Sequence, residues 1–376
     1  MVIKDLLEEM IRQDASDVYI TAESTPMYRV EGVVHPWGSE KLTPSQTEEL
    51  ANSIMMEKQQ IRFAEELEMN LALYYPDLGR FRVNIFRQRG CVGIVIRQIK
   101  INIKSLDDLG LPQILKDNSM EKRGLVLVVG GSGTGKSTTL AAMIDYRNSN
   151  SPGHIITVED PIEFIHLHKR SLVTQREVGM DTNSFADALK NTSRQAPDVI
   201  LIGEVRDVET MESAITFAET GHLCLATLHA NNANQALERI LNFFPEERHP
   251  QILLQLSLNL RAIISQRLIA TPDGRRVAAV EILIATPRVK DLIYKNEVGL
   301  LKEAMAQGSQ DGMQTFDQHI FILYKEGRIS YENAIAYADS ANDVRLRIKI
   351  DKVGAADKKE AFEDKDLKLK PDIKTF

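Results

Sequence analysis

The first hundred residues combine helical and alternating patterns of apolar side chains. The residues Ile3, Leu6, Leu7, Met10 and Ile11 share one helical face and predict an amphipathic helix at the start of the chain. Short alternating or β-rich runs predict strands at Asp17–Thr21, near Met27–Val34, and at Leu71–Tyr75, Gly79–Gln88 and Val92–Ile99. An N-cap, a proline and a capping-box glutamine at 43–46 predict a helix towards residue 56. We therefore expect a small α/β domain with a mostly antiparallel sheet over residues 1–100, and it carries no evident catalytic constellation.

The pattern changes beyond residue 100. Residues 101–112 are typical of a linker, and a second domain begins between about residue 105 and residue 113 and extends to 350. Buried-type apolar runs predict strands near 125–129, 155–158, 199–202 and 223–228, with helices between them. This alternation predicts a parallel sheet with crossover helices. From about residue 235 we expect mostly helix, and the interleaved charges of 351–376 predict a solvated, mobile tail.

The segment Gly130–Ser137 has the pattern G-x-x-x-x-G-K-S and lies between a predicted strand and a predicted helix. Strand, glycine loop and helix together favour a phosphate cradle over a chance glycine turn. Lys136 could reach the β- and γ-phosphates of ATP, and the Ser137 hydroxyl could hold Mg²⁺. The predicted phosphate contacts are Gly131, Ser132, Gly133, Thr134, Gly135, Lys136, Ser137 and Thr138.

Two acidic clusters follow predicted strands, at the sheet edge where catalytic ligands collect. Glu159, Asp160 and Glu163 follow the first strand, and Pro161 turns the chain between them. The second strand ends in Gly203-Glu204 instead of the usual aspartate, which makes an atypical Walker B motif. Either cluster alone could be an ordinary polar exit from a strand, but after a phosphate loop in this order they favour ATP hydrolysis.

Two histidines, His222 and His229, flank the apolar run at 223–228. A single histidine is more often structural than catalytic, and a zinc site lacks regularly spaced further ligands. The functional alternative is a sensor of the γ-phosphate or a hydrogen-bonded neighbour of Glu204.

Composition narrows the class of protein. The net charge of −7 gives no overall attraction to nucleic acid. Cys91 and Cys224 are far apart, and their apolar flanks predict reduced core thiols, as expected of a cytoplasmic protein. Apolar runs stay short of the roughly 18 residues that span a bilayer.

The ordered motifs resemble those of the secretion-superfamily ATPases, and more closely those of the type IV pilus retraction ATPases, the PilT and PilU family. The resemblance covers about residues 1–350 and is carried by GGSGTGKSTT (130–139), ITVEDPIEF (156–164), PDVILIGEVRD (197–207) and AETGHLCLATLH (218–229). SQRL (265–268), RRVAAVEIL (275–283) and MQTFDQHI (313–320) also match. The segment 288–297 departs from the usual PilT pattern and, with the charged tail, is similar to PilU-type members.

This resemblance implies a PAS-like N-terminal domain, a RecA-like P-loop domain with a parallel sheet, and C-terminal helices. It implies a homo-hexameric ring with Mg²⁺ and ATP at subunit interfaces, in which Glu163 acts as general base supported by Glu159. Glu204 would be the Walker B acid, with His222 and His229 as the histidine pair. Arg80, Arg82 and Arg97 are candidates for completing a neighbour's site in trans, although surface salt bridges would explain each equally well.

The resemblance further implies a cytoplasmic protein that is peripherally associated with the inner membrane through the pilus machinery. Its partners would be a PilT-like retraction ATPase and a PilC-like platform protein, with no nucleic acid. The function that the resemblance implies is a hexameric ATPase motor that powers pilus retraction, as a PilU-type accessory to a PilT-type motor. The alternatives in the same superfamily are a PilT-type primary retraction motor and a secretion or pilus-assembly ATPase, and the missing four-cysteine site counts against the latter. A RecA-like nucleic-acid translocase and a ring subunit that works mainly by docking to an active motor are the alternatives from other classes.

Overall fold

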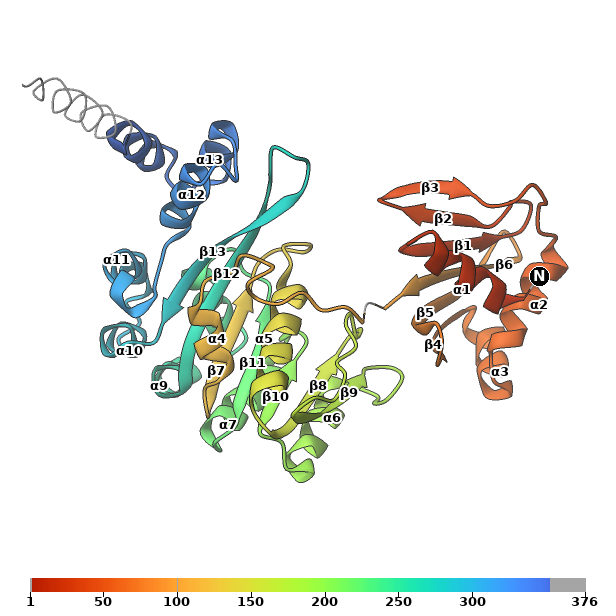
Figure 1. Cartoon of the computed structure of the whole chain (residues 1–376). Helices are drawn as coiled ribbons and strands as arrows, with labels where there is room; N and C mark the ends of the chain where they lie inside the picture. The colour runs from red at the N-terminus through yellow and green to blue at the C-terminus, as the bar shows by residue number, and fades with distance from the viewer. Residues whose placement is uncertain (1, 100, 352–376) are drawn as a thin grey trace, which may run out of the picture.

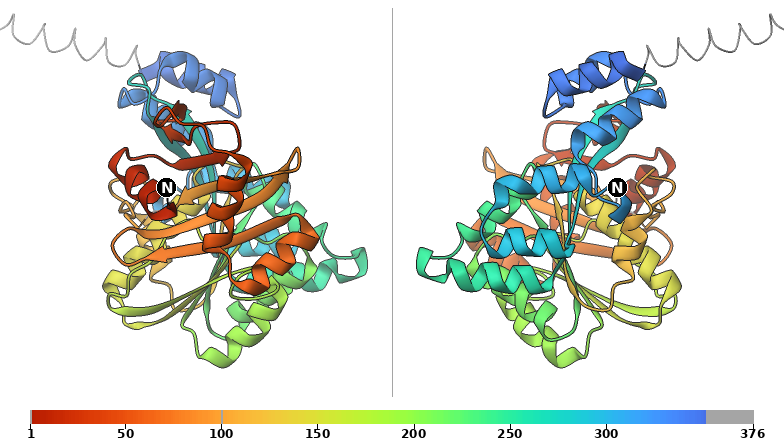
Figure 2. Two further views of the ribbon diagram at one scale, coloured as in Figure 1. Left: turned by 90° about the vertical axis from the view of Figure 1, so that its right-hand side faces the viewer. Right: turned by 90° about the vertical axis from the view of Figure 1, so that its left-hand side faces the viewer.

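The computed structural model describes residues 2–99 and 101–351, which form two α/β domains in series (Figure 1). The predicted tail at 351–376 lies outside the described residues, apart from its first residue. In the two views of Figure 2, the N-terminal domain lies on one side of the second domain and the C-terminal helices lie on the other. The predicted fold class, an antiparallel domain followed by a largely parallel one, is confirmed.

Within residues 2–99 the N-terminal domain has one antiparallel six-stranded sheet in the order β3-β2-β1-β6-β5-β4. Its strands are β1 (Asp17–Thr21), β2 (Met27–Val30), β3 (Val33–Pro36), β4 (Glu68–Tyr75), β5 (Gly79–Gln88) and β6 (Cys91–Gln98). Its helices are α1 (Ile3–Arg12), α2 (Pro44–Ile54) and α3 (Glu57–Glu66). The α2 cap forms as predicted, since the Thr43 Oγ1 atom accepts from Gln46 N and the Gln46 side chain accepts from Thr43 N. Cys91 is only half-buried, unlike the core position that was predicted.

Within residues 101–351 the second domain has a seven-stranded sheet in the order β13-β12-β7-β11-β10-β8-β9, in which every neighbouring pair except β12–β13 is parallel. Its strands are β7 (Gly124–Val129), β8 (Gly153–Glu159), β9 (Ser171–Glu177), β10 (Val199–Ile202), β11 (Leu223–Leu228), β12 (Leu260–Ala270) and β13 (Arg276–Ile284). All four predicted strands form. Beyond residue 235 most of the described residues are helical, as predicted, but two further strands that were not predicted, β12 and β13, complete the sheet beside the P-loop strand β7.

Helices cover both faces of this sheet. They are α4 (Ile114–Ser119), α5 (Lys136–Asn150), α6 (Phe185–Thr192), α7 (Val208–Glu219), α8 (Ala233–Leu241), α9 (His249–Asn259), α10 (Pro287–Tyr294), α11 (Leu301–Gln307), α12 (Phe316–Lys325) and α13 (Tyr331–Tyr337), and residues 341–351 are also helical. Leu125 and Leu127 of β7 pack towards α6–α11, whereas Val126 and Val128 pack towards α4 and α5. This alternation explains why β7 is apolar throughout.

The connection between the domains is shorter than the predicted linker. Leu106 and Leu111 are buried in the core that α5 shares with the sheet. The chain therefore joins the second domain from about Ser105 onwards, and a short tether after Ile99 connects the two domains.

Candidate active site

The phosphate loop joins the end of β7 to the start of α5. The Lys136 Nζ atom donates to the carbonyl oxygens of Gly130 and Gly131, at 2.9 Å from each. Thr134 Oγ1 also donates to Gly131 O at 2.9 Å. Gly135 has a φ of +90°, a left-handed value that favours glycine, and it directly precedes the helix. The loop therefore curls around an ammonium group at the positive end of a helix, which suits an anion.

The residues around this ammonium fit a nucleotide with Mg²⁺. Ser132, Gly133 and Ser137 are exposed, so loop atoms and the Ser137 hydroxyl are accessible to a ligand. Mg²⁺ keeps several waters and commonly takes few protein ligands beside the phosphates of its substrate. Among the described residues, His, Cys, Asp and Glu do not gather in a group of three or more that could hold a metal ion by themselves. A hydroxyl beside substrate phosphates is thus the kind of magnesium site that this edge can offer.

A chain of charged contacts links the second acidic cluster to the histidine segment. Glu204 Oε1 lies 3.0 Å from His229 Nε2, and Glu204 Oε2 lies 2.6 Å from Arg206 Nη2. Arg206 Nη1 continues to Asp160 Oδ2 at 3.4 Å. The parallel register of β8, β10 and β11 explains this contact, because the residues that follow these strands meet at one edge. The structure thus brings Glu204 and His229 together and adds Arg206, a residue whose role the sequence motifs alone do not indicate.

Burial and charge set the protonation of this cluster. Burial lowers the pKa of His229, and the positive charge of Lys136 lowers it further against the attraction of Glu204. A neutral imidazole that carries its proton on Nε2 can donate to the Glu204 carboxylate, which fixes its ring orientation. Burial also lowers the pKa of Lys136, and Glu204 opposes this shift.

The two glutamates of the first cluster occupy different surroundings. Glu159 is half-buried and accepts from Thr157 Oγ1 at 2.6 Å and from Gln175 Nε2 at 3.4 Å. Burial raises its pKa to about 7 despite these hydrogen bonds. Glu163 is exposed and, together with Lys136, lines a cavity that is described below. Only Glu163 is therefore directly open to a ligand in this cavity.

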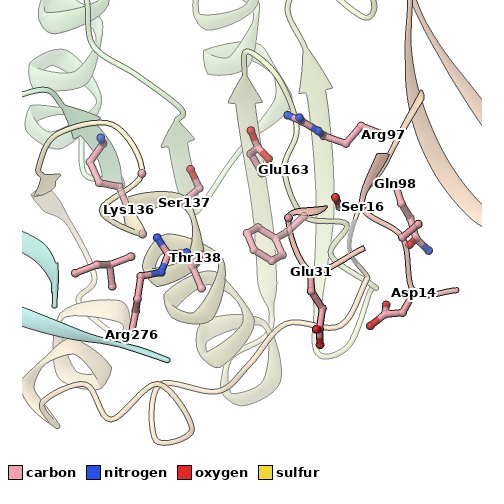
Figure 3. A pocket seen from close by; sticks show the side chains of 16 residues that line it. Asp14, Ser16, Glu31, Arg97, Gln98, Lys136, Ser137, Thr138, Glu163 and Arg276 are labelled. Carbon is pink, nitrogen blue, oxygen red and sulfur yellow. The ribbon is translucent and has the colours of Figure 1, made fainter. Parts of the chain in front are cut away.

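That cavity has a volume of about 700 Å³ and is lined by both domains (Figure 3). Its labelled lining residues are Asp14, Ser16, Glu31, Arg97 and Gln98 from the N-terminal domain and Lys136, Ser137, Thr138, Glu163 and Arg276 from the second. Arg97 pairs with Asp17 at 2.7 Å and points towards Glu163 (Figure 3). Side chains of the N-terminal domain thus reach the space beside the phosphate loop of the same chain.

The other two candidate arginines lie outside this cavity. Arg80 and Arg82 on β5 face Glu177 at the end of β9, where burial raises the glutamate's pKa and the two guanidinium groups lower it. Neither arginine lines the cavity beside Lys136. Within one chain the structure therefore places Arg97, but not Arg80 or Arg82, at the cavity beside Lys136.

The structure separates the two histidines. His222 precedes β11, and its backbone oxygen accepts from Gly124 N at the start of β7. Its Nδ1 atom lies 3.2 Å from Phe217 O and 3.1 Å from Thr220 Oγ1. His229 follows β11 at the opposite edge, about 20 Å away at the usual rise per strand residue. The two histidines thus do not form a pair at one site within the chain, and His222 has the contacts of a structural residue.

Comparisons with known proteins place the chain in a family. The model of the family described as Type II/IV secretion system protein matches residues 1–331. The chain is 56% identical over 358 residues to the type IV pilus ATPase PilU of Pseudomonas aeruginosa, covering 95% of this chain and 94% of that protein. It is 44% identical to the pilus retraction ATPase PilT of the same organism, covering 89% of this chain and 97% of that one.

Solved structures agree with these relatives. A crystal structure of the pilus retraction motor PilT with bound ADP matches with a TM-score of 0.85 and 41% identity over 91% of this chain and 98% of that one. The ATPase DotB of Legionella pneumophila matches with a TM-score of 0.73 and 26% identity over 89% of this chain and 95% of that one. In the described residues, helices that combine enough length and apolar character to cross a membrane are absent. The class of enzyme predicted from the motifs, an ATPase, is confirmed by these relatives, and the chain belongs to the family of type II/IV secretion system proteins.

Proposed function

We propose that this chain hydrolyses ATP at the cavity beside Lys136. The observation that carries the proposal is the meeting of a phosphate loop with the Glu204–His229 pair at one edge of the parallel sheet. Lys136 would exchange its carbonyl partners for phosphate oxygens and offset the charge that develops on the transferred group. Loop N–H groups from Gly131 to Thr138 would cradle the phosphates. Ser137 would hold Mg²⁺, which when bound neutralises charge on the β- and γ-oxygens.

The exposed carboxylate, Glu163, is suited to orient and deprotonate the attacking water. Its position in the open cavity supports this role, and Glu159 behind it would support the segment through its contacts with Thr157 and Gln175. Glu204 would act as the Walker B acid, oriented by Arg206 and His229. Of the three candidate arginines, Arg80, Arg82 and Arg97, Arg97 is the one that lines the cavity with Lys136 and points towards Glu163.

We further propose that hydrolysis powers type IV pilus retraction, with this chain as a PilU-type accessory to a PilT-type motor. The 56% identity to PilU over nearly the whole chain supports this proposal. The protein would assemble as a homo-hexamer with nucleotide at its subunit interfaces. It would act in the cytoplasm at the inner membrane, against a PilC-like platform protein. The alternative is a ring subunit that works mainly by docking to an active motor.

Steady-state ATP hydrolysis and binding of a fluorescent ADP analogue test the chemistry. Lys136→Ala should abolish turnover because the compensating charge is lost, and Glu204→Ala should abolish turnover but spare ADP binding. Lys295→Ala removes a lysine that pairs with Asp291 on the surface and is the matched control. Full turnover in Lys136→Ala or Glu204→Ala would contradict the site.

Pilus retraction in a bacterium that lacks its PilU-type protein tests the biological role. The wild-type chain should restore retraction when a PilT-type motor is present, and Lys136→Ala should fail to do so. Full restoration by Lys136→Ala would favour the docking alternative, since that subunit would work without turnover.

A further inference from the structure

The segment Ser265–Leu268 of β12 runs beside the phosphate loop. Strand β12 pairs in parallel with β7, and Ser265 lies opposite Val129, the last residue of β7. The next residue, Gln266, therefore lies level with Gly130, where the loop begins. The pairing of β12 with β7 thus places a polar residue, Gln266, beside the first residue of the phosphate loop.

Gln266 is 3% exposed, and its side chain contacts the loop and the first turn of α5. Its Oε1 atom accepts a hydrogen bond of 2.8 Å from Thr139 Oγ1. A Cβ atom at Gly135 would lie 2.8 Å from its Nε2 atom, and one at Gly130 would lie 2.7 Å from its carbonyl oxygen. Gln266 thus fills the space that the two outer glycines of the loop leave free.

The neighbours of Gln266 point to the other face of the strand, as alternation requires. Ser265 Oγ donates to Glu281 at 2.9 Å. The Arg267 guanidinium stacks on Phe316, 3.8 Å from the ring centre, and pairs with Asp339 at 2.7 Å. On one face of β12, Arg267 therefore contacts the C-terminal helical region. On the opposite face, Gln266 contacts the phosphate loop.

We propose that Gln266 is a positioning residue for nucleotide binding. Its buried amide fixes the turn from Gly135 to Thr139, so that the loop N–H groups and Lys136 are aimed before the phosphates arrive. This inference rests on the proposed nucleotide site. Gln266 has no proposed contact with the nucleotide and takes no chemical step, because its side chain contacts the loop and the helix.

A double-mutant cycle on ADP affinity tests the proposal. Gln266→Met keeps length and burial but removes the amide, and Thr139→Val removes the hydroxyl at similar volume. Each should raise the Kd for ADP about 5- to 10-fold, the range expected for one lost hydrogen bond. The double variant should bind about as well as either single variant, because both remove the same interaction. Thr139→Ser keeps the hydroxyl and should rescue the affinity.

Two controls separate positioning from general stability. Arg267→Met should lower the melting temperature through the opposite face of β12, yet leave the Kd for ADP within about twofold of wild type. Melting curves of every variant, with and without ADP, show which ones are folded. The proposal is overturned if Gln266→Met and Thr139→Val lose stability but keep wild-type affinity, or if their effects on affinity simply add. Failure of the wild-type chain to bind ADP would instead contradict the proposed function.

Discussion

Two glutamates four residues apart differ in how they are solvated. Glu163 is exposed beside the cavity, whereas Glu159 is half-buried and its pKa is raised to about 7. The segment ITVEDPIEF cannot show this difference, because it depends on Gln175 from another strand and on the packing around Thr157. Sequence thus identifies the acidic residues but not their protonation.

The raised pKa of Glu159 makes stability fall as pH rises. Between about pH 4.5 and pH 7 the unfolded chain releases the Glu159 proton while the folded chain keeps it. The protonated Glu159 side chain therefore makes its full contribution to the free energy of unfolding below pH 4.5, and this contribution is lost as the pH rises through about 7. Glu159→Gln should therefore gain stability relative to wild type between pH 5 and pH 8, by at most about 3 kcal/mol. Denaturant unfolding at both pH values measures this difference. Glu163→Gln controls for the loss of a carboxylate in the same segment, and an unchanged difference for Glu159→Gln would refute the burial argument.

At the scale of elements, the last residue of the predicted Walker B segment caps the N-terminus of a helix. Asp207 is the N-cap of α7, and its Oδ1 atom accepts from Thr210 N at 2.8 Å and from Thr210 Oγ1 at 2.6 Å. These hydrogen bonds lower its pKa. Helix α7 packs on the sheet beneath β7 and β11, so this cap also fixes the chain three residues after Glu204.

Removing this cap should destabilise the protein. Asp207→Ala should lower the free energy of unfolding by about 1 kcal/mol, the usual loss for a helix cap, while Asp207→Asn keeps an acceptor and should stay near wild type. Denaturation curves of the three proteins at neutral pH measure the effect. Equal stability of the alanine and asparagine variants would show that the side-chain acceptor contributes nothing.

The arrangement of the strands explains which parts of the fold the sequence could and could not predict. The strands β7, β8, β10 and β11 were predictable because each is a short apolar run between turns. The stretch from 249 to 270 is apolar across a helix and a strand, and periodicity cannot divide such a stretch. Missing β12 also meant missing Gln266. The contacts of Arg206 with Glu204 and Asp160 likewise depend on strand order, which single motifs do not contain.

At the scale of the whole molecule, the cavity lies between two domains, and the proposed ring would bring further groups to it. If subunits share sites, ATP hydrolysis per chain should rise with protein concentration as rings form. A dilution series that combines light scattering with ATPase assays would test this expectation. Activity per chain that stays constant down to concentrations at which only monomers remain would rule out shared sites.

The short tether limits how such sharing can occur. Five residues separate Ile99 from Ser105, which makes six steps along the chain, and an extended chain spans at most about 3.5 Å per step, so the tether reaches no further than roughly 20 Å. Arg97 lies just before this tether and moves with its domain. In the proposed ring, its guanidinium could therefore approach the nucleotide of its own chain or that of the adjoining chain, but not one on the far side of the ring. In such a ring, a change in the position of the N-terminal domain would act directly on the nucleotide sites of its own chain and the adjoining chain, and on no more distant site.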